Sequence, residues 1–473
     1  MQTRTLLVLL LLSTAGCGPD RAPDRIIQDL SQPSGDMEVG ASVAFRLPHN
    51  GGDAKLYRLP EMSEVSWEFD AGPRPILSIV GFARDKDLVL SLVSHSAKGG
   101  RDFVALDLVT GRSRTLDTSI ALATIGPTGQ TSVVRADGVL GEVDASGRID
   151  EWSDTLSQIP THLWGALRDR IVATVSDSAP ELLMLAEGQD PIRQRIPRGA
   201  IAISRWGRFV VVATDSGLAT FDPADPGEAS FIRTETATTQ VVLSPSAHRI
   251  YAVQGANELV SFDRFQPDER NVLVLPGPIG ALRMDPFGRI LLAESQTADS
   301  IWIVDLAGVK IVGTVSADWD SDLPAVAPDG GVLVRRGDTV RALEPGTFES
   351  AQSLRASRAD RWMVTAWDPR RPALELASDS VARPEQAGQI MYVQVSSSRN
   401  PAWAEDFARE LRDAGMNASV LQPDSAGFAA DELFRVVLGP YTSRAEAELA
   451  GKKLGRPFFI ITREVISPES IQP

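Results

Sequence analysis

Three residues near the C-terminus carry side chains that can stack on a ring or form hydrogen bonds. Tyr392 and Gln394 alternate with apolar residues in one segment, and Arg435 does so in another. Aromatic rings stack on the apolar faces of pyranoses, while amide and guanidinium groups bridge hydroxyl and N-acetyl oxygens. Such a surface binds without any titrating catalyst. The alternative interpretation is that these are ordinary side chains on a solvated sheet face.

The rest of the chain offers little that predicts catalysis. The histidines stand singly, at spacings that bring no two imidazoles to one metal ion: His49, His95, His162 and His248. No nucleophile elbow, phosphate-binding loop or dinucleotide fingerprint occurs. We therefore predict no catalytic residue, no metal site and no cofactor. A fold built from repeats can still assemble a site from one residue of each repeat, so spacing does not exclude one.

Two strand and helix units in succession position the polar residues. In Met391-Tyr-Val-Gln-Val-Ser396, apolar and polar side chains alternate, which predicts a strand with one face buried. Asn400 is a good N-cap and Pro401 suits the first helical position. Apolar residues then recur at helical spacing until Gly415, so we expect an amphipathic helix between Pro401 and Gly415.

The second unit repeats this plan. Leu433-Phe-Arg-Val-Val-Leu438 predicts a strand that places Arg435 and Val437 on the same face as Gln394. Ser443-Arg-Ala-Glu446 is a capping box, and it predicts a helix with Ala447, Ala450 and Leu454 buried. A short strand near 418–421 and a last strand over 458–462 complete a ferredoxin-like βαββαβ module. In that order the first and third strands are neighbours, so Gln394 and Arg435 are expected side by side.

The module resembles the SPOR (sporulation-related repeat) domain. The resemblance lies in Tyr392-Val-Gln-Val, Ala404-Glu-Asp-Phe-Ala-Arg-Glu-Leu-Arg, Phe434-Arg-Val-Val-Leu-Gly-Pro-Tyr441 and Ser443-Arg-Ala-Glu-Ala-Glu. It implies binding to bacterial peptidoglycan, especially to glycan strands without stem peptides, and a link to cell division or cell-wall remodelling. Where the family usually has Gly-Ser/Ala-Phe, this chain has Ser396-Ser397-Ser398. The implied glycan-binding residues, on the sheet face that the helices leave open, are Tyr392, Gln394, Ser396, Arg435, Val437 and Tyr441.

The N-terminus has the pattern of a short secretory signal. Arg4 precedes an apolar run, and from Leu6 to Gly16 there are 11 residues, against about 20 for a membrane span. Small residues lead into Cys17, the single cysteine of the chain, so no internal disulfide forms. This junction resembles a bacterial lipobox, although Thr14 stands where Leu is usual. The resemblance implies lipidation of Cys17 and, with Gly18 after it, sorting to the outer membrane facing the periplasm.

The long middle of the chain repeats a turn followed by a buried strand. Successive anchors are separated by 43, 41, 37, 40, 41 and 42 residues, a period typical of propeller blades. The anchors are Arg84, Pro127, Arg168, Arg205, Pro245, Pro286 and Pro328. The flanks 43–59 and 362–381 are expected to complete a further blade or to close the ring by sharing strands. We interpret the tryptophans, such as Trp206 and Trp302, as packing between blades.

These patterns predict an all-β propeller of seven or eight blades, similar to WD-repeat and YVTN propellers, followed by the α+β module. The predicted segments are a signal peptide (1–17), a tether (18–40), the propeller (41–381), a linker (382–388), the SPOR domain (389–466) and a tail (467–473). We expect the linker to act as a hinge between two units that fold separately.

Composition excludes one class of partner. The net charge is -15 and the pI is about 4.9, and no basic stripe offers phosphate contacts, so we expect no nucleic-acid binding. We interpret the chain as a non-enzymatic envelope lipoprotein that binds glycan strands and membrane, with the propeller as a scaffold for a protein partner. The alternatives are a wall-tethered propeller enzyme, hydrolase or lactonase-like, and a small-ligand sensor. Acidic or histidine side chains converging at the channel mouth would favour an enzyme.

Overall fold

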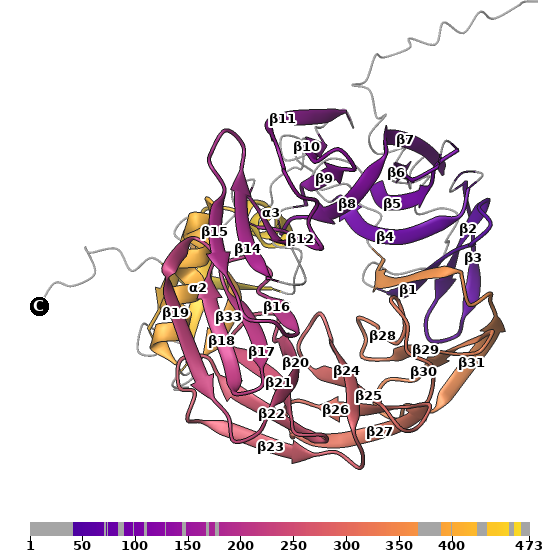
Figure 1. Cartoon of the computed structure of the whole chain (residues 1–473). Helices are drawn as coiled ribbons and strands as arrows, with labels where there is room; N and C mark the ends of the chain where they lie inside the picture. Colours follow the sequence, from indigo (N-terminus) through magenta and orange to yellow (C-terminus); the bar gives the residue numbers. More distant parts are fainter. Residues whose placement is uncertain are drawn as a thin grey trace, which may run out of the picture.

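The described part of the chain forms a closed ring of β-sheets with a small α+β domain beside it (Figure 1). The structure is a computed structural model. It describes residues 41–367 and 389–464, except for 71, 73, 84–88, 98, 108–110, 128, 144–147, 167–169, 176–178, 399, 423–432 and 454–457. The predicted signal, tether, linker and tail, with Cys17, lie outside these residues.

Within the described residues the ring has eight four-stranded antiparallel blades. The prediction of a propeller with seven or eight blades is therefore confirmed, and the number is eight. Blade 1 joins the two ends of the propeller, in the order β32 (Arg361–Ala366), β1 (Ser42–Leu47), β2 (Asp53–Arg58) and β3 (Ser63–Asp70). Strand β32 pairs with β1 over six residues, from Ser42 opposite Ala366 to Leu47 opposite Arg361. The flanking segments therefore close the ring by sharing one blade, as expected from the sequence.

The other blades use consecutive strands. Blade 2 contains β4 (Ile76–Ala83), β5 (Val89–His95), β6 (Arg101–Asp107) and β7 (Arg112–Thr118). Blade 3 contains β8 (Ile120–Ile125), β9 (Thr131–Arg135), β10 (Val139–Val143) and β11 (Ile149–Thr155). Blade 4 contains β12 (His162–Gly165), β13 (Arg170–Val175), β14 (Glu181–Ala186) and β15 (Ile192–Arg195). Blade 5 contains β16 (Ile201–Ile203), β17 (Val210–Thr214), β18 (Gly217–Asp222) and β19 (Asp225–Arg233). Blade 6 contains β20 (Thr238–Leu243), β21 (Arg249–Gln254), β22 (Glu258–Asp263) and β23 (Arg270–Val274). Blade 7 contains β24 (Ile279–Met284), β25 (Ile290–Ser295), β26 (Ser300–Asp305) and β27 (Lys310–Ser316). Blade 8 contains β28 (Ala325–Val326), β29 (Val332–Arg336), β30 (Thr339–Leu343) and β31 (Ser350–Arg355).

The middle strands of the blades are buried on both faces, which explains their continuous apolar runs. In β17 the burial extends over four successive residues, and in β18 over five. Trp302 packs between blades 6 and 7 with Tyr251 and Leu291, as predicted. The acidic residues at the blade ends cap turns: Asp305 Oδ2 accepts a hydrogen bond from the Gly308 amide at 2.8 Å. Each blade thus needs its neighbours to cover its faces, and apolar clusters between neighbouring blades, such as those joining blades 5 and 6 and blades 6 and 7, hold the ring together.

The C-terminal domain has the predicted βαββαβ order. Its elements are β33 (Gln389–Ser398), α2 (Pro401–Asp413), β34 (Ala418–Leu421), β35 (Phe434–Tyr441), α3 (Arg444–Lys453) and β36 (Phe459–Glu464). Asn400 caps α2 by accepting the Trp403 amide at 3.1 Å, and Gly415 ends it with a φ of 78°. Ser443 Oγ accepts the Glu446 amide at 3.2 Å in the predicted capping box.

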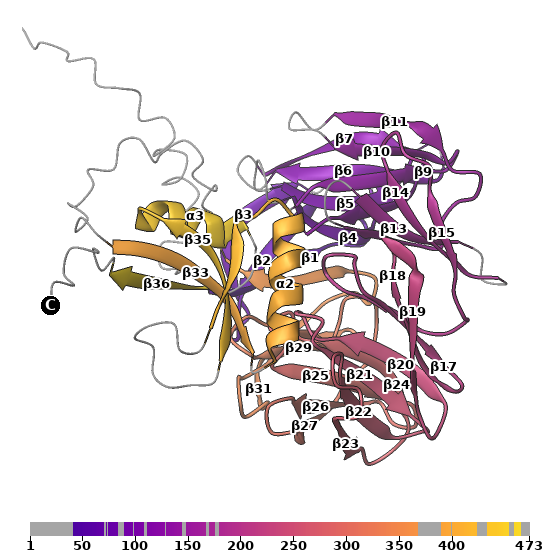
Figure 2. The same cartoon turned by 90° about the vertical axis from the view of Figure 1, so that its left-hand side faces the viewer.

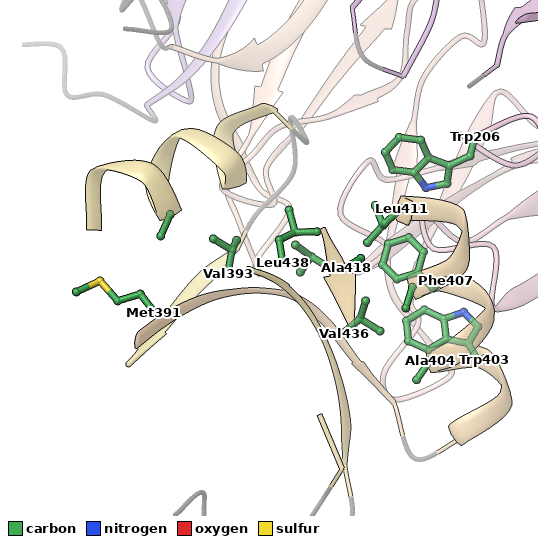
Figure 3. Packing of buried hydrophobic residues seen from close by; sticks show 13 residues of the cluster. Trp206, Met391, Val393, Trp403, Ala404, Phe407, Leu411, Ala418, Val436 and Leu438 are labelled. Carbon is green, nitrogen blue, oxygen red and sulfur yellow. The ribbon is translucent and has the colours of Figure 1, made fainter. Parts of the chain in front are cut away.

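The sheet order is β34-β35-β33-β36, so the first and third strands are the central neighbours, as predicted. Both helices lie on the same face of this sheet and cover its apolar side chains (Figure 3). Val393, Phe407 and Leu411 are each at most 1% exposed there. Ala447 is fully buried and Ala450 is half-buried, while Leu454 lies outside the described residues. Among the described residues, no helix covers the opposite face of the sheet.

Candidate functional site

The face of the sheet opposite the helices is built from one row of cross-strand partners. Gln394 on β33 lies opposite Val437 on β35 and, on its other side, opposite Phe459 on β36. Val437 in turn lies opposite Ser419 on β34. Because directly paired residues of a sheet project to the same face, these four side chains form one row across all four strands. Tyr392 lies two residues from Gln394 and opposite Ile461, on the same face.

This row is exposed at one end and closed at its centre. Phe459 is 72% exposed, the largest exposure among the large apolar side chains described. Gln394 and Tyr392 are half-buried, and Val437 is fully buried. An exposed ring beside an amide is a combination that suits a pyranose with an N-acetyl group. The accessible part of the face is therefore the edge formed by β33 and β36.

A β-bulge changes the predicted face of two residues. Between Gln394 and Ser396 the register against β35 shifts, so that Ser396 lies opposite Val436, whose side chain belongs to the core under the helices. Ser397, which is exposed, takes the position opposite Arg435 on the open face. The strict alternation assumed from the sequence fails here because a bulge inserts an extra residue into one strand. The structure thus places Ser396 on the helix side and Ser397 in the row that Ser396 was predicted to occupy.

Arg435 and Tyr441 also differ from their expected positions. Arg435 is on the strand beside Gln394 but lies diagonal to it, and it is only 8% exposed. Tyr441 lies opposite Met391 and packs against the core under the helices, where burial raises the pKa of its phenol. Of the six predicted residues, Tyr392, Gln394, Arg435 and Val437 share the open face. Only Tyr392 and Gln394 among these have partly exposed side chains.

Sequence reasoning missed Phe459. The last strand was predicted, but two aromatic residues, Phe458 and Phe459, follow one another there, and the sequence does not tell which of them faces outward. The pairing of β36 with β33 decides it: Phe458 packs against the helix-side core, and Phe459 lies beside Gln394. The register of a strand is set by its partners, so no local signal in residues 458–462 contains this information.

Two further features bear on what the site can do. Within the part of the chain that the structure describes, no three His, Cys, Asp or Glu side chains gather closely enough to hold a metal ion. Neither α2 nor α3, the two helices among the described residues, is long and apolar enough to cross a membrane.

The propeller resembles solved structures in its fold. Similar structures are apo AztD from Citrobacter koseri (12% identity, 69% of this chain and 98% of that chain, TM-score 0.47), dihydro-heme d1 dehydrogenase NirN in complex with DHE (12%, 71% and 76%, TM-score 0.50) and a eukaryotic initiation factor (13%, 70% and 99%, TM-score 0.46). At such low identity the comparison with NirN supports the fold alone. No curated protein matches the chain in sequence.

A family model matches the C-terminal module. The model of the SPOR domain covers residues 387–460, which include α2, α3 and the candidate row from Ser419 to Phe459. The match confirms the resemblance drawn from the sequence, and it supports peptidoglycan binding by this part of the chain. With its matched residues and its βαββαβ order, the C-terminal part of this chain is a SPOR domain.

Proposed function

We propose that this protein is a lipid-anchored component of the bacterial cell envelope that binds glycan strands of peptidoglycan through its SPOR sheet. The propeller serves as a rigid scaffold for a protein partner, and the whole protein lies at the outer membrane facing the periplasm. Binding needs no catalyst, because stacking and hydrogen bonds to neutral sugars suffice. A role in cell division or wall remodelling would appear as enrichment of the protein at the septum.

The observation that carries this proposal is the cross-strand pair Gln394–Phe459 on the open face of a SPOR sheet. Phe459 supplies an exposed aromatic face, and Gln394 supplies a donor and an acceptor next to it. Arg435 and Val437 lie behind this pair and are buried, so we assign them to the support of the face. Tyr392 extends the exposed row along β33.

The ring of Phe459 should contribute measurably to binding. We expect Phe459→Ala to weaken binding to sacculi stripped of stem peptides by about tenfold, since a stacked ring contributes on the order of 1 kcal/mol beyond its buried area. Gln394→Ala should weaken binding in the same direction. A sedimentation assay over a range of sacculus concentrations measures both effects.

The matched control is Phe231→Ala, because Phe231 is also an exposed ring, 46% accessible, but lies on the propeller strand β19. It should bind sacculi like the parent. Arg435→Ala is avoided because it removes a buried side chain and would mix a loss of stability with a loss of contact. If folded Phe459→Ala and Gln394→Ala bind like the parent, the glycan does not lie on this face.

The membrane anchor rests on the sequence pattern around Cys17. Each buried methylene contributes about 0.8 kcal/mol, so several acyl chains on one cysteine hold a protein firmly at a bilayer. We expect Cys17→Ser to move the protein from the membrane fraction to the soluble fraction, with both domains still folded. Fractionation of cells with immunoblotting measures this change. Unaltered membrane association of the variant would exclude Cys17 as the anchor.

A further inference from the structure

Helix α2 lies between its own sheet and the propeller (Figure 2). One propeller side chain, Trp206, is 2% exposed and belongs to the same apolar cluster as Trp403, Phe407 and Leu411 of α2 (Figure 3). The prediction that Trp206 packs between blades is therefore wrong. It packs against the C-terminal domain, some 200 residues away in sequence. A large ring buried at such a contact indicates an interface rather than a passing collision of two tethered domains.

One flank of α2 carries an aromatic residue and three acidic residues. Trp403, Asp406, Glu410 and Asp413 recur at intervals of three, four and three residues, so they follow one line along the helix. We call this line the docking stripe. The core of the SPOR domain does not need its charges, because the sheet is covered by Ala404, Phe407 and Leu411. The carboxylates of Asp406 and Asp413 point to a basic partner.

The propeller offers a basic partner, Arg264, on a turn that hydrogen bonds within the propeller hold in place. Asp263, at the end of β22, accepts hydrogen bonds from the Phe265 and Gln266 amides at 2.9 and 3.2 Å and contacts His248 Nε2 at 2.6 Å. The same carboxylate thus fixes the turn that presents Arg264 and the imidazole that stacks on Trp403, with ring centroids 5.1 Å apart. Preorganised groups lose little entropy when they bind.

The charges of the two surfaces are complementary. Arg264 pairs with Asp406 at 3.1 Å, and its guanidinium lies 4.0 Å from the ring centroid of Phe209. Arg208 pairs with Asp413 at 2.5 Å and with Asp222 of its own blade at 3.3 Å. Arg264 is 19% exposed and Asp406 is 14% exposed, so their pair is shielded from solvent and salt more than a surface pair.

We propose that the propeller carries a preformed docking surface for the acidic stripe of α2, so that the two domains move as one body with the glycan-binding face turned away from the propeller. The surface consists of Trp206, Arg208, His248, Arg264 and Phe265. Helix α2 lies on the side of the sheet that faces the propeller (Figure 2). Docking therefore uses the helix side of the sheet, and the pair Gln394 and Phe459 belongs to the opposite face. The expected flexible hinge between 382 and 388 then connects domains that hold one another directly.

The test reverses the acidic stripe in the full chain. In the triple variant Asp406→Arg/Glu410→Arg/Asp413→Arg, three cations face Arg208 and Arg264, so we expect α2 to leave the propeller. Small-angle X-ray scattering should then give a larger radius of gyration and maximum dimension than for the parent. Adding Arg208→Glu and Arg264→Glu should restore the compact form. Arg270→Glu is the matched control, since Arg270 lies on the propeller strand β23 and forms an exposed pair with Glu235 of the propeller at 2.8 Å.

Binding to sacculi checks that the triple variant remains folded, because its open sheet face is unchanged. If the triple variant binds sacculi and keeps the compact scattering profile of the parent, the docking surface is refuted. A parent protein that already scatters as two freely moving domains would refute it equally. If the triple variant fails to bind, the single variant Asp413→Arg replaces it, because Asp413 lies at the last position of α2, with its side chain 40% exposed.

Docking should also depend on pH through Glu410. This carboxyl is 3% exposed, and its nearest guanidinium, that of Arg264, is 4.0 Å away. Burial raises the pKa of Glu410 to about 7, and the negative charge of Asp222 adds to the rise. The positive charges of Arg264, Arg208 and Arg409 oppose it. A cleft of about 810 Å³ beside these residues admits solvent. Because the raised pKa favours the protonated docked form, docking should weaken as pH rises from about 4.5 to about 7.

The contribution of Glu410 to the pH dependence of docking is isolated by comparing the parent with Glu410→Gln. His248 contributes with the opposite sign, since burial lowers its pKa although Asp263 opposes the shift, and this contribution is common to both proteins. Relative to Glu410→Gln, the fraction of docked parent should fall between pH 5 and pH 7, with a docking constant reduced by about tenfold or more. Scattering profiles at both pH values measure it. Identical pH dependence of the two proteins would contradict the assignment to Glu410.

Discussion

Asp360→Ala should lower the free energy of unfolding of the propeller by about 3 kcal/mol, because it leaves the Arg46 guanidinium and the His49 and Ser357 amides without their acceptor. Asp360 immediately precedes β32, the C-terminal strand of blade 1, and its side chain is 2% exposed. It pairs with Arg46 of β1 at 2.7 Å and accepts the His49 amide at 3.0 Å. The carboxylate therefore joins the two ends of the propeller where the ring closes. Thermal unfolding followed by circular dichroism measures the loss.

The matched control is Asp305→Ala, because Asp305 caps a turn of blade 7 by accepting one amide and does not lie at the closure. This substitution should lower the free energy of unfolding by about 1 kcal/mol. A loss of stability in Asp360→Ala no larger than in Asp305→Ala would mean that the closure does not depend on this carboxylate.

Acid should weaken the same contact. Burial alone would raise the pKa of Asp360, but the hydrogen bonds from His49 and Arg46 outweigh burial and lower it. A lowered pKa means that the carboxylate stabilises the fold above its ordinary pKa of 3.8, and that this contribution is lost as pH falls through the lower value in the folded protein. The stability difference between the parent and Asp360→Ala should therefore narrow below about pH 3.8.

Val393→Asp should unfold the SPOR domain and abolish binding to sacculi. Val393 is fully buried in the middle of β33, under both helices, and a carboxylate there finds no partner in the apolar core. The cost exceeds about 4 kcal/mol, which is a large part of the stability of a small domain. Leu411→Asp, from the facing side of α2, should have the same effect. Limited proteolysis with mass spectrometry would show cleavage within 389–464.

Ser397→Asp is the control for that experiment. Ser397 lies on the same strand but is exposed, so its substitution should change stability by no more than about 0.5 kcal/mol. Resistance of Val393→Asp to protease, equal to that of Ser397→Asp, would contradict the assignment of Val393 to the core.

Much of this architecture could be predicted from local signals. The repeat period near 40 residues indicated the blades, and Asn400, Gly415 and Ser443 marked helix ends that the structure keeps. Such signals act within a few residues, so the sequence contains them directly. The flanks that complete blade 1 were also predictable, since a ring with free end strands would leave a sheet edge unpaired.

What escaped prediction depends on contacts between distant segments. The bulge that moves Ser396 to the helix side arises from pairing of β33 with β35, and the outward position of Phe459 arises from pairing with β36. The docking of α2 depends on Trp206, Arg208 and Arg264. These residues precede their partners on α2 by about 140 to 205 residues and give no local periodicity. Alternation predicts which side chains share a face only while the register holds.

The central claim is that the SPOR domain of this protein binds glycan strands. The most direct test is cosedimentation of the full chain with purified sacculi, either untreated or treated with an amidase that removes the stem peptides. We predict that the protein sediments with sacculi, that amidase treatment increases the bound fraction, and that Phe459→Ala reduces it. A folded protein that stays in the supernatant with both preparations would contradict the account.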